Sequence, residues 1–219
     1  MKTLPFAIFD MDGTLVDSMP CWYSLHGDYV RARYPETPSH VIKDIEAAWG
    51  FENIFAAFLR HGIAFTREDY FSFLEERMGY YYSQVVEPKP KTKALLEGLK
   101  KAGCKMGVIT MTPHRGADFC LAKTGLAPYF SFVLTREDTP DGSGKEKELI
   151  FRMAMEKLGC EKAEDCAFYE DSLYAIKTAH KMGFYVCAVE DRWGEETHRE
   201  ISALADEVVS LGYHLPDKA

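Results

Sequence analysis

The chain has 219 residues, of which 47% are apolar and 27% charged, and its 26 basic and 34 acidic side chains give a formal net charge of −8. The composition is that of an ordinary globular protein, and its acidic balance argues against nucleic acid or an anionic membrane surface as the partner. No secretory signal segment and no apolar run of ~18 residues is visible, so we expect a cytoplasmic protein that spans no membrane.

The N-terminal stretch LPFAIFDMDGTLVDS places a short apolar run, expected to be a buried strand, directly before two aspartates. Asp10 and Asp12 leave this strand two residues apart, and Gly13 allows the backbone to turn sharply after them. Because an unpaired buried charge is strongly unfavourable, the pair requires a compensating partner elsewhere in the chain. A solvated loop is the alternative, whereas a calcium-binding loop is disfavoured because Gly13 stands at its fourth position rather than its sixth.

The segment 18–88 differs from the rest of the chain in its residue pattern and composition. It contains no convincing strand and predicts helices at about 19–33, 39–48, 51–61 and 66–83. Aromatic side chains are dense in it, and most of them should form the core of a helix bundle. The sequence EPKPK at 87–91 closes the segment as a stiff linker. We therefore expect an all-helical domain, 18–88, inserted after the first strand.

From Lys91 onward, short apolar runs alternate with segments whose apolar residues recur at helical spacing. This alternation predicts a parallel sheet with helices on both faces. The expected strands are CKMGVI, SFVL, CAFY and FYVCAV, and the expected helices span 91–103, 112–125, 145–159 and 172–183. Thr112 is expected to cap the second of these helices, with Pro113 at its first position. The fold class is thus α/β, with a Rossmann-like core made of 1–17 and 89–219.

Polar residues lie at or just beyond the ends of further predicted strands. Thr110 ends one strand beside a helix N-terminus, Glu170 and Asp171 end another before Ser172, and Lys145 precedes the third helix. Taken singly, each has a structural explanation, namely a helix cap, favourable charge at a helix N-terminus or simple contact with solvent. Together with the first aspartates they predict one site, because the carboxyl ends of parallel strands are where ligands bind.

The donor types in this set indicate metal-assisted phosphate chemistry. Carboxylates from two strands suit Mg²⁺, and the expected metal residues are Asp10, Asp12, Glu170 and Asp171, with the backbone carbonyl of Asp12 turned back toward the ligand. The cation would offset the acids and, together with Lys145, would face a dianionic phosphate. The aspartate pair would then serve as nucleophile and acid/base.

These residues, in this order, resemble the four motifs of the haloacid dehalogenase superfamily. DMDGTLVDS is similar to the first motif, Thr110 to the second, Lys145 to the lysine of the third, and EDS at 170–172 to the acidic fourth. The order and spacing match across nearly the whole chain, and the helical insertion resembles the first type of cap, in the β-phosphoglucomutase and phosphoglycolate-phosphatase branch. KEKE stands where the family often has Lys-Pro-x-Pro, so Lys147 is a rival of Lys145, although its position favours Lys145.

The resemblance implies a Mg²⁺-dependent phosphatase for a small phosphorylated metabolite of the sugar phosphate, phosphoglycolate or nucleotide class. Asp10, ionised at neutral pH, would attack phosphorus and form an aspartyl-phosphate, while Asp12 would act first as general acid and then as general base. Thr110 and Lys145 would hold the phosphoryl oxygens, and Asp171 would anchor the metal.

Other functions compatible with this scaffold are only partly separated by the sequence. Asp12 argues against a dehalogenase, since that branch lacks the second carboxylate. The nearest alternative is a β-phosphoglucomutase-like phosphosugar mutase, although Trp22 stands near the position of its cap histidine. A phospho-accepting receiver-like protein and a catalytically silent binding protein are further alternatives. Substrate choice is expected to lie in the helical domain, with Trp49, Phe51 and Asn53 as candidate contacts.

Overall fold

The computed structural model describes residues 2–48, 50–192 and 197–213. The chain divides into two compact units, one comprising Met1–Asp17 with Val86–Ala219 and the other Ser18–Val85. We call them the sheet unit and the helical unit. The second is an insertion in the first, so the sheet unit is assembled from two separate stretches of chain.

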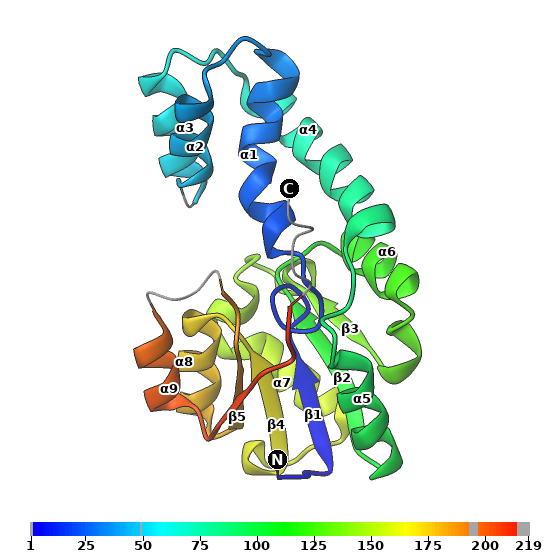
Figure 1. Cartoon of the computed structure of the whole chain (residues 1–219). Coiled ribbons are helices and arrows are strands. Elements are labelled where there is room, and N and C mark those ends of the chain that lie inside the picture. The colour runs from blue at the N-terminus through cyan, green and yellow to red at the C-terminus, as the bar shows by residue number, and fades with distance from the viewer. Residues whose placement is uncertain (1, 49, 193–196, 214–219) are drawn as a thin grey trace. The chain divides into compact units, whose positions relative to one another are not determined.

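The sheet unit is built on one parallel sheet, in which the described residues form six strands in the order β3-β2-β1-β4-β5-β6 (Figure 1). The strands are β1 (Phe6–Phe9), β2 (Lys105–Thr110), β3 (Val133–Thr135), β4 (Cys166–Glu170), β5 (Tyr185–Val189) and β6 (Glu207–Val209). The central strands are buried almost throughout, as expected when helices cover both faces. The predicted α/β class and parallel sheet are confirmed.

Helices cover the two faces of this sheet. They are α5 (Thr92–Lys101), α6 (His114–Thr124), α7 (Glu148–Leu158), α8 (Leu173–Met182) and α9 (His198–Leu204). The right-handed crossovers place α5 and α6 on one face and α7, α8 and α9 on the other (Figure 1). Under the second group lies a core in which the rings of Phe151 and Phe168 meet edge to face, 5.1 Å apart. This packing fixes the strand ends from which the polar residues project.

The helical unit contains α1 (Met19–Arg33), α2 (Ser39–Glu46), α3 (Phe51–Arg60) and α4 (Arg67–Tyr80), followed by a π-helical turn at Tyr81–Val85. Its centre is aromatic, as the composition predicts. Tyr29, Phe58 and Tyr70 are fully buried, and the Tyr29 and Tyr70 rings lie edge to face with centroids 5.2 Å apart. Aromatic burial therefore supplies much of the stabilising apolar contact of this unit.

Two chain segments lead out of and back into the sheet unit. They pair with each other on the sheet-unit side, since the Asp17 N–H donates to the Glu87 carbonyl at 2.9 Å and Val16 forms an antiparallel bridge with Pro88. The Lys89 N–H in turn donates to the Leu15 carbonyl at 3.0 Å. Both segments are thus anchored to the sheet unit by backbone hydrogen bonds.

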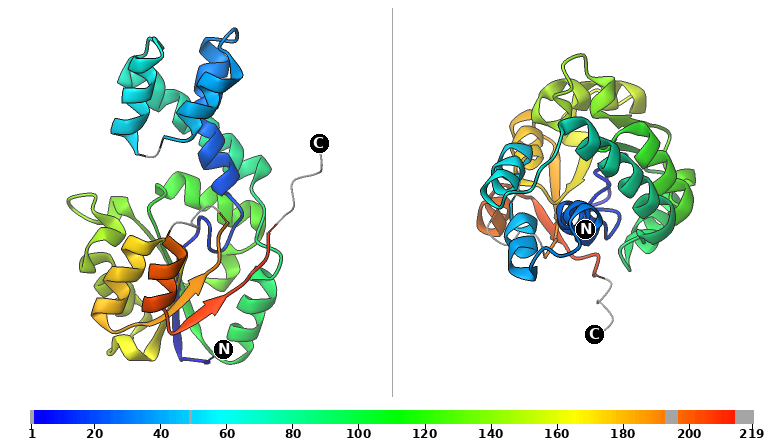
Figure 2. Two further views of the ribbon diagram at one scale, coloured as in Figure 1. Left: turned by 60° about the vertical axis from the view of Figure 1, so that its left-hand side comes forward. Right: turned by 90° about the horizontal axis from the view of Figure 1, so that it is seen from above.

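Several element boundaries differ from the sequence-based expectations. α4 ends at Tyr80 because the chain continues as a π-helical turn, and α6 begins at His114 with Pro113, not Thr112, in the capping position. Helix α9 and strand β6 were not predicted, and β6 is visible in red beside β5 in the left view of Figure 2. Short 3₁₀ turns also occur at Ala127–Tyr129, Arg136–Asp138, Gly144–Glu146 and Ala163–Asp165.

Among the described residues, no helix has the length and apolar character needed to cross a bilayer.

A buried ion pair fastens the returning segment to the end of β5. The Lys89 side chain is 1% exposed, and its Nζ donates to Asp191 Oδ2 and to the Glu190 carbonyl, each at 2.9 Å. A lysine in this position requires both acceptors, because a buried ammonium without partners is strongly destabilising.

Substitution Lys89→Met should therefore lower the free energy of unfolding by about 3–5 kcal/mol, because it removes the ammonium that pairs with the buried Asp191 carboxylate. Lys177, whose exposed side chain pairs with Glu200 at 3.0 Å, provides the control. Lys177→Met should change the free energy by only about 0–1 kcal/mol. Urea unfolding of the two variants measures both values, and equal small effects would show that the Lys89 pair is not a stabilising anchor.

Candidate active site

The predicted site residues converge at the carboxyl edge of the sheet. Asp10 directly follows β1, Thr110 ends β2 and Glu170 ends β4, and all three are buried, with exposed fractions of 3%, 1% and 0%. The parallel register pairs Phe9 with Tyr169, which sets Asp10 beside Glu170. Strands that are separate in sequence therefore deliver their terminal polar groups to one place.

Lys145 lies inside this group of acids. Its side chain is 2% exposed, and its Nζ is 2.5 Å from Asp10 Oδ1 and 2.7 Å from Glu170 Oε2. The 3₁₀ turn that carries it depends on Gly144, because a Cβ there would lie 2.4 Å from the Met111 sulfur, and its φ of 48° is in the left-handed region. Close approach of this turn to the end of β2 is what brings the ammonium to Asp10.

Lys147, the rival for the lysine role, is placed quite differently. Its side chain is 64% exposed and its Nζ pairs with Asp141 at 2.6 Å. The structure therefore brings Lys145 together with the acids at the strand ends and leaves Lys147 in an ion pair at the surface.

Three carboxylates form a cluster that could hold a metal ion. Asp10, Glu170 and Asp171 each offer an oxygen, and the three oxygens lie within 4.8 Å of one another. Glu170 Oε1 accepts the backbone N–H groups of Asp171 and Ser172 at 3.2 and 2.9 Å, which fixes the orientation of this carboxylate. Hard oxygen donors at this spacing fit Mg²⁺, the ion expected from the sequence.

Asp171 is positioned by residues of the first loop. Thr14 is fully buried and donates its hydroxyl to Asp171 Oδ1 at 3.0 Å. Gly13 has a φ of 77°, and a Cβ at this position would lie 2.4 Å from Asp171 Oδ2. The loop after β1 can approach the acid only because this residue is glycine. No role was predicted for Thr14, although it lies two residues from Asp12 in the same motif.

The electrostatics of the cluster follow from burial and crowding of like charges. Burial, together with the charge of Glu170, raises the pKa of Asp10 to about 8, although Lys145 opposes the shift. Burial and the charges of Glu170 and Asp10 also hold the pKa of Asp171 well above its usual value. Burial disfavours the Lys145 ammonium, but Asp10 and Glu170 outweigh it and raise its pKa. Without a bound cation these shifts favour the protonated form of Asp10, and a bound cation would restore the ionised form expected from the sequence.

The Asp12 side chain is not part of the three-carboxylate cluster. It is half-buried, and its Oδ2 accepts the Thr112 hydroxyl at 2.7 Å. Thr112 is therefore not the helix cap that its sequence position predicted. Its hydroxyl bonds to an acid of the first motif instead, and Pro113 takes the capping position. Any contribution of Asp12 to a metal site remains a prediction that involves its carbonyl.

Tyr174 and the candidate substrate contacts are not part of the three-carboxylate cluster. Tyr174, in the first turn of α8, is 41% exposed and its ring lies 5.9 Å from Lys145 Nζ. In the helical unit, Phe51 is 41% exposed and packs edge to face on Phe71, while Asn53 is exposed. Trp49, the remaining candidate substrate contact, lies outside the described residues.

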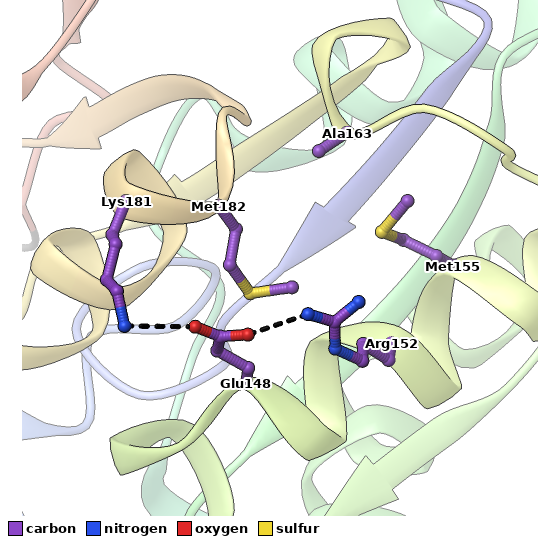
Figure 3. Close-up of a pocket in the computed structure, with 6 residues that line it drawn as sticks. All are labelled: Glu148, Arg152, Met155, Ala163, Lys181 and Met182. Atoms are coloured by element: carbon purple, nitrogen blue, oxygen red, sulfur yellow. Dashed lines mark hydrogen bonds and ion pairs between the residues drawn. The ribbon is translucent and has the colours of Figure 1, made fainter.

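A separate hollow of about 380 Å³ lies between α7 and α8 and contains none of the predicted site residues. Figure 3 shows that its polar wall is Glu148, which points toward Arg152 and Lys181 and bonds to them at 2.7 and 3.1 Å. The cationic groups are thus already paired with an acid, and the rest of the lining is apolar. This arrangement offers no reactive group.

Comparison with known proteins places these features in a family. The model of the haloacid dehalogenase-like hydrolases matches residues 6–183. A phosphoglycolate phosphatase of Rhodobacter capsulatus is 28% identical over 158 residues, which are 68% of this chain and 72% of that protein. A phosphorylated carbohydrates phosphatase of Thermotoga maritima is 24% identical over 80% of each chain. The structure of CbbY from Rhodobacter sphaeroides in complex with phosphate shares the fold, with a TM-score of 0.71 and 19% identity over 94% of this chain and 93% of that one.

The raised pKa of Asp10 makes stability depend on pH and on metal. The folded protein retains a proton on Asp10 up to a pKa of about 8, whereas the unfolded chain loses it near the ordinary value, so this contribution to stability is lost as pH rises through that interval. Without metal, the melting temperature of the wild type should therefore fall with pH more steeply than that of Asp10→Asn. Added Mg²⁺ competes with the proton and should stabilise the wild type more at about pH 9 than at about pH 6.

Differential scanning fluorimetry across this pH range, with Mg²⁺ or with chelator, measures both effects. Glu164→Gln, which alters an exposed acid distant from the cluster, is the control and should follow the wild type. A Mg²⁺-induced shift of the same size at every pH, retained in Asp10→Asn, would show that the cation binds elsewhere.

Proposed function

This chain belongs to the haloacid dehalogenase-like hydrolases, and we propose that it is a Mg²⁺-dependent phosphatase that hydrolyses a small phosphomonoester through an aspartyl-phosphate on Asp10. The observation that carries the proposal is the buried contact of Asp10 with both the Lys145 ammonium and the other carboxylates of the cluster. The phosphatases among its relatives, which are named for phosphoglycolate and for phosphorylated carbohydrates, support the same substrate class.

The metal would be held by Asp10, Glu170 and Asp171, whose oxygens already face one another. When bound, the cation supplies positive charge that lowers the pKa of Asp10 and stabilises negative charge on the phosphoryl oxygens. Thr14 and the backbone N–H groups of Asp171 and Ser172 would keep the ligands oriented.

Asp10 is proposed as the nucleophile. Its ionised carboxylate forms a bond to phosphorus while the bond from phosphorus to the ester oxygen breaks, and Asp12 donates a proton to the departing oxygen. Asp12 then accepts a proton from the water that attacks the aspartyl-phosphate. This second step releases inorganic phosphate and regenerates Asp10 as a carboxylate and Asp12 as an acid.

Thr110 and Lys145 are proposed to hold the equatorial oxygens of the transferring group. Thr110 is buried at the end of β2, and the N–H of Thr112 donates to its Oγ1 at 3.1 Å, which fixes the position of that oxygen. Lys145 is kept charged by two acids and can therefore offer its ammonium to an incoming dianion.

The helical unit, within the predicted domain 18–88, is proposed to act as a cap that selects the substrate and limits access of water. Its exposed aromatic and amide groups, such as Phe51 and Asn53, are candidate contacts for the part of the substrate beyond the phosphate. We propose a small metabolite rather than a macromolecule, in line with the substrates named for the relatives.

The test is phosphate release from a panel of sugar phosphates, phosphoglycolate and nucleoside monophosphates, with Mg²⁺ or with chelator. The wild type should release phosphate only with the cation, and Asp10→Asn should be inactive while remaining folded, because an amide forms no acyl phosphate. Appreciable turnover by Asp10→Asn, after deamidation has been excluded, would contradict the assignment of the nucleophile.

The two lysines of KEKE provide a matched pair of controls. Lys145→Met should reduce kcat/KM by about 10²-fold or more, because one donor to the transition state is lost. Lys147→Met removes the same charge from an exposed ion pair and should leave activity near the wild-type level. Equal losses in the two variants would indicate a general charge effect rather than a specific contact.

A further inference from the structure

Thr112 is a buried threonine whose hydroxyl bonds to the proposed acid/base. Its exposed fraction is 4%, and its Oγ1 donates to Asp12 Oδ2 at 2.7 Å. The two residues are 100 positions apart in the chain. The contact links the loop after β1 to the loop after β2, and it lies wholly within the sheet unit.

The local backbone explains why this hydroxyl is directed to Asp12. The Thr112 N–H donates to Thr110 Oγ1 at 3.1 Å, so the turn after β2 is closed by a side chain. Other residues occupy the start of α6. Pro113 is in the capping position, and Glu137 accepts the His114 N–H at 2.8 Å. Helix formation therefore does not require the Thr112 hydroxyl.

We propose that Thr112 is a positioning residue for Asp12, an inference that rests on the proposed phosphatase function. A hydroxyl that donates to Oδ2 makes this oxygen an acceptor, so the proton that Asp12 transfers is carried by Oδ1. That proton leaves Oδ1 for the departing ester oxygen in the first step, and a proton from the attacking water returns to Oδ1 in the second. Thr112 thereby determines which oxygen of the acid/base faces the reaction.

The turn after β2 also connects the residue that orients Asp12 to the proposed phosphate ligand. Thr110, the proposed phosphate ligand, accepts the N–H of the residue that orients Asp12. All three residues belong to the sheet unit. An Asp12 carboxylate held in this orientation is ready to accept the proton from the water that attacks the aspartyl-phosphate.

The experiment compares Thr112→Val, which keeps the side-chain shape but removes the donor, with Thr112→Ser, which restores it. Each is assayed by steady-state kinetics on an alkyl phosphate that the wild type hydrolyses, and by rapid quench on p-nitrophenyl phosphate, whose leaving group departs without a proton. Thr124→Val is the matched control, because it also removes a buried hydroxyl. Thr124 lies in α6, and its hydroxyl donates to the Cys120 carbonyl at 2.6 Å.

Thr112→Val should lower kcat on the alkyl phosphate by about 10–100-fold with little change in KM, the usual range for loss of a partner that orients an active-site group. On p-nitrophenyl phosphate it should release a burst of at most one equivalent of nitrophenol and then turn over slowly, since water activation is impaired. Thr112→Ser should recover most of the loss, and Thr124→Val should behave as the wild type.

Three results would overturn the proposal while leaving the phosphatase function intact. They are wild-type kinetics for Thr112→Val, equal losses on both substrates with no burst, and a change confined to KM, which would mean that Thr112 contacts the substrate directly. Failure of the wild type itself to release phosphate would instead refute the proposed function, and this inference with it.

Discussion

The structure depends on the burial of opposite charges at the carboxyl edge of the sheet. Three carboxylates, Asp10, Glu170 and Asp171, face one another there, and a single ammonium, from Lys145, lies among them. One cation cannot balance three anions. Burial, together with the charge of Glu170, therefore raises the pKa of Asp10 to about 8 and holds the pKa of Asp171 well above its usual value. A divalent cation relieves this excess and leaves Asp10 ionised, which is the state that a nucleophile requires.

The fold makes this arrangement possible through strand order and two glycines. β1 is central, with β2 and β4 as its neighbours, so residues that end three different strands meet without long loops. Gly13 and Gly144 allow the two remaining segments to approach within distances that a side chain would prevent. The apolar packing of α7 and α8 against β4 then keeps the strand ends in place, which is why a site of buried charge can be rigid.

Much of this was predictable from the sequence, because an acid at the end of a buried strand requires a compensating partner. The parallel sheet, Asp10, Thr110 and the acidic pair Glu170 and Asp171 all follow from that pattern. Position along the chain favoured Lys145 over Lys147, but the burial of Lys145 could not be predicted, since it depends on the turn at Gly144. The partnership of Thr112 with Asp12 was missed for the same reason: a threonine before Pro113 has the sequence signature of a helix cap, and only the tertiary fold supplies a different acceptor. The short strand β6 is too brief for periodicity to reveal.

Chemical trapping of the intermediate tests the central claim that Asp10 accepts the phosphoryl group. Borohydride reduces an acyl phosphate to an alcohol but leaves a free carboxylate unchanged, so quenching steady-state turnover with borohydride should convert Asp10 to homoserine. Peptide mass spectrometry should find that change at position 10 only when substrate and Mg²⁺ are both present. Sustained turnover with Asp10 unmodified, or with reduction at a different aspartate, would contradict the account.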